Sequence, residues 1–167
     1  MIKKIPFGEI DAFNVMVEVS EGGAKKYAYD TEMEAVKLSR VLYDGLVMPF
    51  NYGFIAQTEN ADSNHLDVFI LCTHPLSRGT VVECRAIGML KMNDRGKQDN
   101  KIIAVPLNES RMENLQDITD WPESEQEKIL NFYRQASVQW DSTIELLGFA
   151  NKESAKKEIL RTLEFSR

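Results

Sequence analysis

The sequence has few of the residues that build disulfide scaffolds, basic surfaces or membrane spans. Its only cysteines, Cys72 and Cys84, lack CxxC spacing, so we expect two buried free thiols in the reducing cytoplasm. No apolar stretch approaches the roughly 20 residues that cross a bilayer, and residues 1–9 lack the apolar segment of a secretory signal. The net charge of −6 argues against a non-specific nucleic-acid binder, which needs a basic face. We therefore expect a cytoplasmic protein that binds neither membranes nor nucleic acid.

What remains is the composition of an ordinary globular domain. Hydrophobic residues make up 43% of the chain and charged residues 28%, as is usual for a folded soluble protein. A chain of 167 residues fits one domain and buries roughly two-thirds of its unfolded surface. Repeats and low-complexity tracts are absent from the sequence. We expect residues 1–167 to form a single domain.

Strand patterns fill the first two-thirds of the chain. Residues 13–20 alternate apolar and polar side chains with a period of two, which predicts a half-buried strand. Gly88 lies inside another β segment and indicates a bend or bulge there. The other predicted strands are residues 25–29, 66–72, 80–92 and 101–105.

The last third has helical patterns. Ser124 and Glu127 have capping-box spacing, and Pro122 suits the start of a helix. The buried face of this helix is predicted to carry Ile129, Phe132, Tyr133 and Ala136. A final helix, capped by Asn151, is predicted to face inward with Ala155, Ile159, Leu160 and Leu163. Strands first and helices last predict an α+β fold with an antiparallel sheet closed as a small barrel.

Aspartates gather at the ends of two predicted strands. Asp62 and Asp67 precede a buried apolar strand, and Asp94 and Asp99 lie in the polar turn after the long strand that follows. Carboxylates without a Cys/His ligand pattern suit hard cations such as Mg²⁺. Because bound Mg²⁺ keeps positions open for water and phosphate oxygens, the cluster indicates phosphoryl chemistry. Taken alone, the polar turn has the composition of a solvated loop.

Other motifs occur along the chain in an order that matches a known family. These motifs are Val15–Val19 with its Glu18, Lys26-Tyr27, Arg40, Pro49–Ile55 and Arg85–Met92. With the aspartates, they resemble the soluble family I inorganic pyrophosphatases over nearly the whole chain. The resemblance implies a five-stranded OB-like antiparallel barrel with flanking C-terminal helices. It also implies hydrolysis of diphosphate with Mg²⁺ (or Mn²⁺ or Co²⁺), and a homo-oligomer, hexameric as bacterial members commonly are.

The resemblance gives each candidate site residue a role. The principal metal would be bound by Asp62, Asp67 and Asp99. A second metal, which arrives with the substrate, would be bound by Asp94 with Asp99, and Glu18 would support a metal through a water. Phosphate oxygens would be bound by Lys26, Arg40 and Lys101. The catalytic set would be Asn64, Asp67 and Tyr52, with Tyr52 hydrogen-bonded near the metals.

The sequence departs from the family pattern at positions of this one site. Asn64 stands where the family has the aspartate that accepts a proton from the attacking water, and an amide has no useful basicity. General-base catalysis is worth about 10²–10⁴-fold, so we expect slowed hydrolysis or a shifted metal or pH preference. The other departures are Ala28, Met48, Ala136 and Ser137. They leave open a paralogue that hydrolyses another phosphoanhydride, or a pseudoenzyme that binds metal and phosphate.

Neighbouring residues offer replacements for the lost groups. His65 could take over the base role or favour Mn²⁺ or Co²⁺, although adjacent residues on an extended chain point to opposite faces. Tyr133 and Arg134 lie nearly one helical turn before the lost donors. Either Arg134 reaches phosphate from a shifted helix, or Tyr133 packs in the core and Arg134 is solvated; the second reading is favoured.

Overall fold

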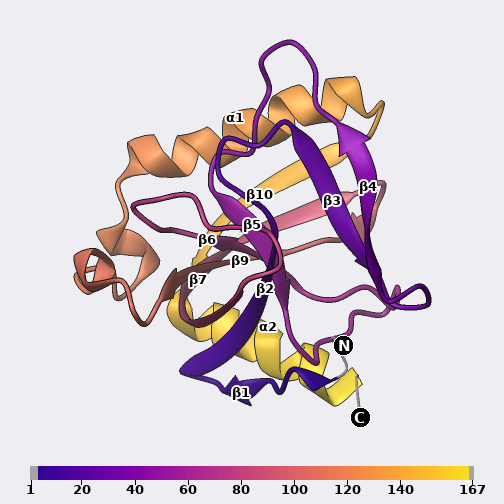
Figure 1. Cartoon of the computed structure of the whole chain (residues 1–167). Coiled ribbons are helices and arrows are strands. Elements are labelled where there is room, and N and C mark those ends of the chain that lie inside the picture. Colours follow the sequence, from indigo (N-terminus) through magenta and orange to yellow (C-terminus); the bar gives the residue numbers. More distant parts are fainter. Residues whose placement is uncertain (1–3, 166–167) are drawn as a thin grey trace.

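The computed structural model describes residues 4–165, and its centre is a closed β-barrel (Figure 1). Five strands form the ring in the order β2, β5, β6, β9 and β7, and pairing of β2 with β7 closes it. Their bounds are β2 Ala12–Val19, β5 Asn51–Ile55, β6 Asp67–Ile70, β9 Lys101–Pro106 and β7 Val81–Asp94. The barrel predicted from the sequence is therefore confirmed.

One pair of barrel strands corrects the antiparallel prediction. Strands β6 and β9 run parallel, with Val68 beside Ile102, whereas the other barrel pairs are antiparallel. The chain passes from β6 to β7 on the far side of β9, and β9 then returns between them. Apolar patterns report burial but not strand direction, so the sequence could not show this parallel pair.

The remaining strands lie outside the ring. Strand β10 (Ile144–Asn151) pairs with β7 beyond the barrel, and β1 (Gly8–Glu9) and β8 (Lys97–Gln98) are short edge pairs. Strands β3 (Lys25–Asp30) and β4 (Ala35–Val41) form a separate two-stranded sheet beside the barrel (Figure 1). Of these, only β3 was predicted.

Strand β2 is more buried than its alternation predicts. From Val15 onward every residue of the strand is buried, including Glu18, which is 6% exposed. Its inner face packs in the barrel core, and on its outer face Met16 packs with Phe54 and Tyr29. Because Tyr29 belongs to β3, the separate sheet covers a face that the sequence pattern left to solvent.

Helix α1 (Glu123–Gln139) lies at one end of the barrel, at the top of Figure 1. The capping-box prediction is wrong: the helix begins before Ser124, with Pro122 at the N-cap position and no side-chain cap. The predicted inner face is confirmed, because Ile129, Phe132, Tyr133 and Ala136 are all buried. With the 3₁₀ turns Ser110–Met112 and Ile118–Asp120, α1 covers the larger core cluster.

Helix α2 (Lys152–Phe165) lies at the opposite end, at the bottom of Figure 1. Its cap is confirmed, because the Asn151 side-chain oxygen accepts a hydrogen bond from the Ser154 N–H at 2.9 Å. Ala155 and Ile159 are buried as predicted, but Leu160 is 48% exposed. Leu160 lies about 100° around the helix from Ile159, outside the buried stripe.

Gly88 marks the bulge that the sequence predicted. The register between β7 and β9 shifts between Ala86 and Gly88. A Cβ atom at Gly88 would come within 2.6 Å of the Ala150 carbonyl oxygen and 2.9 Å of the Ile118 side chain. A larger residue would therefore push β10 and its covering 3₁₀ turn away from the barrel.

Candidate active site

A cleft of about 480 Å³ lies between the barrel and the β3–β4 sheet. Segments far apart in the sequence meet there, from β2, β3, β5, the 60–65 loop, β6 and the 94–101 turn. All the predicted site residues except Arg40 line it, namely Glu18, Lys26, Tyr52, Asp62, Asn64, Asp67, Asp94, Asp99 and Lys101. Their placement in one cleft agrees with the sequence analysis, and their individual roles remain predictions.

The floor of the cleft is an ion-paired triad at the start of two parallel strands. Asp67 begins β6 and Lys101 begins β9, and the β6–β9 register sets them side by side. The Lys101 Nζ lies 2.7 Å from Asp67 Oδ2 and 2.9 Å from Asp99 Oδ1. Burial alone would lower the pKa of Lys101, but Asp67 and its neighbours raise it well above the ordinary value.

Tyr52 completes this floor from β5. Its hydroxyl donates to Asp67 Oδ2 at 2.6 Å. Burial would raise the pKa of Asp67, but Lys101 and Lys26, together with these hydrogen bonds, hold it below the usual value. Asp67 is therefore an ionised carboxylate whose orientation is fixed by two donors.

Glu18 is buried beneath the β3 strand. It accepts a hydrogen bond from the Tyr29 backbone N–H at 2.8 Å. Burial, and then the charge of Asp67, raises the pKa of Glu18 to about 8. A nearby cation would oppose that rise by favouring the ionised form.

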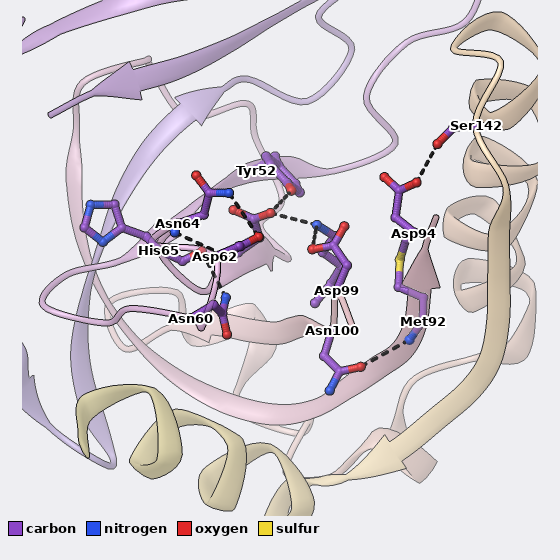
Figure 2. A network of polar contacts seen from close by, with 12 residues as sticks. Tyr52, Asn60, Asp62, Asn64, His65, Met92, Asp94, Asp99, Asn100 and Ser142 are labelled. Atoms are coloured by element: carbon purple, nitrogen blue, oxygen red, sulfur yellow. Dashed lines mark hydrogen bonds and ion pairs between the residues drawn. The ribbon is translucent and has the colours of Figure 1, made fainter. Parts of the chain in front are cut away.

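The 60–65 loop holds Asn64 in a specific way. Asp62 accepts hydrogen bonds from both the backbone N–H and the side-chain amide of Asn64, each at 3.1 Å (Figure 2). His65 stacks on Phe54 with ring centroids 4.5 Å apart, and its Nδ1 donates to the Thr58 carbonyl at 2.7 Å.

Both Asn64 and His65 line the cleft, but Figure 2 shows their side chains pointing apart, with the His65 ring turned away from Asp62 and Asp99 as the sequence analysis favoured. Ser63 adopts a left-handed φ of 67°. The loop is therefore not extended at Ser63, directly before these two residues.

Asp94 lies apart from the floor. Figure 2 shows it turned toward Ser142 and away from Asp62, Tyr52 and Asp99, and the Ser142 hydroxyl donates to it. Arg95 donates from Nε to the same hydroxyl at 3.2 Å and also lines the cleft. The sequence analysis missed Arg95, whose only signal was its place in the polar turn.

Helix α1 does not bring Arg134 into the cleft as a replacement for the lost phosphate donors. Arg134 is exposed and pairs with Glu127 at 2.6 Å, so the solvated reading is confirmed. Tyr133 is buried against Phe69 and Phe132, also as favoured.

The residues that depart from the family pattern pack or hydrogen-bond within their own elements, or lie exposed at the cleft margin. Ala136 is fully buried, and the Ser137 hydroxyl donates to the Arg134 carbonyl of its own helix at 2.9 Å. Met48 is buried in the larger core cluster. Ala28 is exposed on β3 at the cleft margin.

The wall of the cleft is formed by the β3–β4 sheet. Lys26 and Arg40 face each other across its two strands. Both lie over the Trp140 ring, with the Lys26 Nζ 5.1 Å and the Arg40 Cζ 4.8 Å from its centroid. Burial, and then Lys101, lowers the pKa of Lys26. The sequence analysis did not identify Trp140, which no spacing connects to β3 or β4.

The donor set of the cleft fits a hard divalent cation. Its oxygen donors are carboxylates and a phenol, and Asp67 and Asp99 already converge on one cationic nitrogen. Within residues 4–165, however, no three His, Cys, Asp or Glu side chains are gathered closely enough to hold a metal by themselves. Asp94 is the outlying carboxylate, as Figure 2 shows.

Together, the barrel and its cleft define a class of protein: a closed five-stranded barrel with a cleft that brings carboxylates and lysines together. Comparison with known proteins identifies the family. The family model described as inorganic pyrophosphatase matches residues 15–167, so this chain belongs to the inorganic pyrophosphatase family.

Individual relatives match over nearly their whole length. The inorganic pyrophosphatase of Saccharolobus solfataricus is 38% identical over 97% of this chain and 94% of its own. The crystal structure of the Thermus thermophilus inorganic pyrophosphatase has a TM-score of 0.92 at 32% identity, covering 99% of this chain and 98% of that one. The Coxiella burnetii structure also gives 0.92, at 30% identity, and covers 98% and 100%. The described helices include none long and apolar enough to cross a membrane.

Proposed function

We propose that this chain hydrolyses inorganic diphosphate to two phosphates with the help of divalent metal ions. One observation carries the proposal. This chain belongs to the family over nearly its whole length, and four aspartates and three lysines line one 480 Å³ cleft. Carboxylates for metal ions and lysines for phosphate oxygens are the two sets of groups that phosphoanhydride hydrolysis requires.

The proposed metal is Mg²⁺, with Mn²⁺ or Co²⁺ as alternatives. Asp67 and Asp99 would hold it, joined by Asp62 and Asp94, and Glu18 would act through a water. Such an ion neutralises phosphate oxygens and lowers the pKa of a bound water toward about 7. The support is the hard-oxygen chemistry of these side chains.

The other residues would orient the reacting groups. Lys101 and Tyr52 hold Asp67 in one position through hydrogen bonds of 2.7 and 2.6 Å. Lys26 and Arg40 would bind the diphosphate oxygens from the wall. The Asn64 amide can orient a water near the floor but cannot take its proton.

The position of Asn64 also favours a second candidate function. Its amide donates to Asp62 at 3.1 Å, so part of its hydrogen-bonding capacity is already used within the loop. This arrangement is compatible with a protein that binds metal and diphosphate but hydrolyses diphosphate slowly. It is also compatible with one that cleaves another phosphoanhydride.

Assembly and location complete the proposal. We infer one functional domain over residues 1–167 and a homo-oligomer, a hexamer by family resemblance. Cys84 is buried as expected but Cys72 is only half-buried, and both thiols are free, which supports the reducing cytoplasm as the site of action. Sedimentation at several protein concentrations would test the assembly.

A phosphate-release assay tests the function directly. The chain would be given diphosphate, and separately nucleoside triphosphates, in the presence of Mg²⁺, Mn²⁺ or Co²⁺. We expect metal-dependent release from diphosphate well above that from triphosphates. Preferential release from a triphosphate would favour the other phosphoanhydride, whereas tight diphosphate binding without release would favour a pseudoenzyme.

A further inference from the structure

The β3–β4 sheet beside the cleft carries an unusual pair of cations, of which Lys26 lines the cleft and Arg40 lies next to it outside the lining. Lys26 and Arg40 are direct cross-strand neighbours on β3 and β4. Like charges placed opposite each other destabilise a sheet. Among the ion pairs within the described chain, none joins Lys26 or Arg40 to a carboxylate, whereas Lys101 contacts two. Something other than an ion pair must therefore hold the two cations together.

The Trp140 ring is placed to do this. The Lys26 Nζ and the Arg40 Cζ lie 5.1 and 4.8 Å from its centroid, within the roughly 6 Å range of cation–π attraction. Tyr52 offers Lys26 a second ring at 5.5 Å. A carboxylate would cancel the positive charge, whereas an aromatic face attracts a cation and leaves its charge available to an incoming anion.

Trp140 is itself fixed in position. It ends helix α1, where its backbone N–H donates to the Ala136 carbonyl at 2.8 Å, and its ring meets Phe132 edge-on. Gln139 makes two hydrogen bonds to the Tyr43 backbone, at 2.8 and 3.0 Å. These bonds join the end of α1 to the chain just after β4, close to the β3–β4 sheet that carries the two cations. Figure 1 shows α1 and this sheet.

A packing role alone does not account for this tryptophan. Its indole N–H is buried and has no hydrogen-bond partner within the described residues. Buried tryptophans usually pair that group, and an unpaired one costs stability. A phenylalanine would fill the space without that cost, so the larger and more electron-rich ring face is the property that the position uses.

We propose that Trp140 is a positioning residue for diphosphate binding, holding the Lys26 ammonium and the Arg40 guanidinium side by side with their charges unpaired. This inference rests on the proposed function. It assigns the wall to binding of diphosphate and the floor to its hydrolysis. Without the ring, the two cations repel each other and move apart. The ground-state affinity for diphosphate then falls, while the reaction at the floor is little changed.

The test compares Trp140→Leu with Trp140→Phe. Calorimetry would measure binding of Mg²⁺-imidodiphosphate, which is not hydrolysed at its bridging nitrogen, and steady-state kinetics would measure KM and kcat. Trp140→Leu is expected to raise Kd and KM about tenfold and to leave kcat within about threefold. Trp140→Phe should retain most of the affinity, because a weaker aromatic face remains.

Trp121 provides a matched control. It is 4% exposed and packs edge-on against Phe50 and Phe149, with no cation over its ring among the described contacts. Trp121→Phe should lower Tm without changing Kd. An unchanged Kd in folded Trp140→Leu, or equal losses in the Leu and Phe variants, would overturn the inference.

A measurement on a chain that retains Trp140 covers the case in which Trp140→Leu does not fold. The sequence has two tryptophans, so Trp121→Phe leaves Trp140 as the sole indole fluorophore. Saturating Mg²⁺-imidodiphosphate should change its emission, because an anion bound beside the two cations alters the electric field at the ring. Unchanged emission at saturation would overturn the inference while diphosphate hydrolysis by the wild type still stood. Failure of the wild type both to bind and to hydrolyse would remove the proposed function and this inference together.

Discussion

The floor and the wall of the cleft hold their cations in opposite ways. On the floor, Lys101 is 3% exposed and is bound to Asp67 and Asp99. On the wall, Lys26 and Arg40 lie on a two-stranded sheet and rest on the face of Trp140. The floor cation is neutralised by its partners, whereas the wall cations are not.

The difference indicates that the floor and the wall have different functions. A buried lysine between two carboxylates contributes little net charge, but it fixes the carboxylate oxygens in space. Cations held by an aromatic face keep their charge for a ligand. Mutations in the floor should therefore affect stability and activity together, and mutations in the wall should affect binding alone.

Lys101→Met should have the largest effect. It leaves Asp67 and Asp99 close together without their shared cation. The free energy of unfolding should fall by about 2–3 kcal/mol, less than for a fully buried pair because the two aspartates are 27% and 36% exposed. Diphosphate turnover should fall more than about 100-fold. Urea unfolding and phosphate release measure the two effects.

The surface pair of Lys128 with Glu125 is the control for this change. Lys128→Met should change the free energy of unfolding by no more than about 0.5 kcal/mol, as for exposed helical pairs. Equal effects of the two substitutions would show that the floor triad is not a structural unit.

Arg40→Gln should separate binding from stability. We expect KM for diphosphate to rise about 10- to 30-fold, since one of the cations proposed to bind phosphate oxygens is lost. The free energy of unfolding should stay within about 0.5 kcal/mol, because relief of repulsion with Lys26 offsets the lost stacking. A fall of kcat with constant KM would mean that Arg40 acts in the chemical step. Floor and wall would then no longer differ in function.

Asn64→Asp should raise the turnover of diphosphate, whereas Lys101→Met lowers it. If the amide is the only serious defect, turnover should rise about tenfold or more, because a general base is restored. Single-turnover phosphate release with Mg²⁺ measures it. No change would mean that the losses among the phosphate-binding groups dominate, and no turnover in either form would favour a pseudoenzyme.

Glu109 provides a small reference effect outside both regions. It accepts hydrogen bonds from the Thr73 hydroxyl at 2.6 Å and from the Arg111 N–H at 3.1 Å, which lower its pKa to about 2. Because the folded-state pKa lies below the ordinary value of 4.5, this stabilisation is complete above pH 4.5 and is lost as the pH falls toward 2. Glu109→Gln should therefore unfold slightly more readily than wild type near neutral pH, with the difference vanishing in acid. A constant difference across a pH series of urea titrations would contradict this account.

The sequence predicted the floor better than the wall. Asp67 and Lys101 each open an apolar strand, and that local pattern predicted both the strands and the charged residues at their ends. The wall depends on contacts between distant segments, since Trp140 ends a helix and Arg40 lies on a strand with no clear alternation. For the same reason, the burial of Glu18 under β3 and the direction of β9 against β6 could not be read from residue spacing.

The position of β9 also has a consequence for the order of folding. This strand lies between β6 and β7 but is synthesised after both, so the ring cannot close until residues 101–106 have left the ribosome. Until then, the neighbouring edge of β6 has no partner and is open to pairing with other chains. Lys101 is the first residue of that strand, so the same event that completes the barrel brings the floor cation between its two carboxylates.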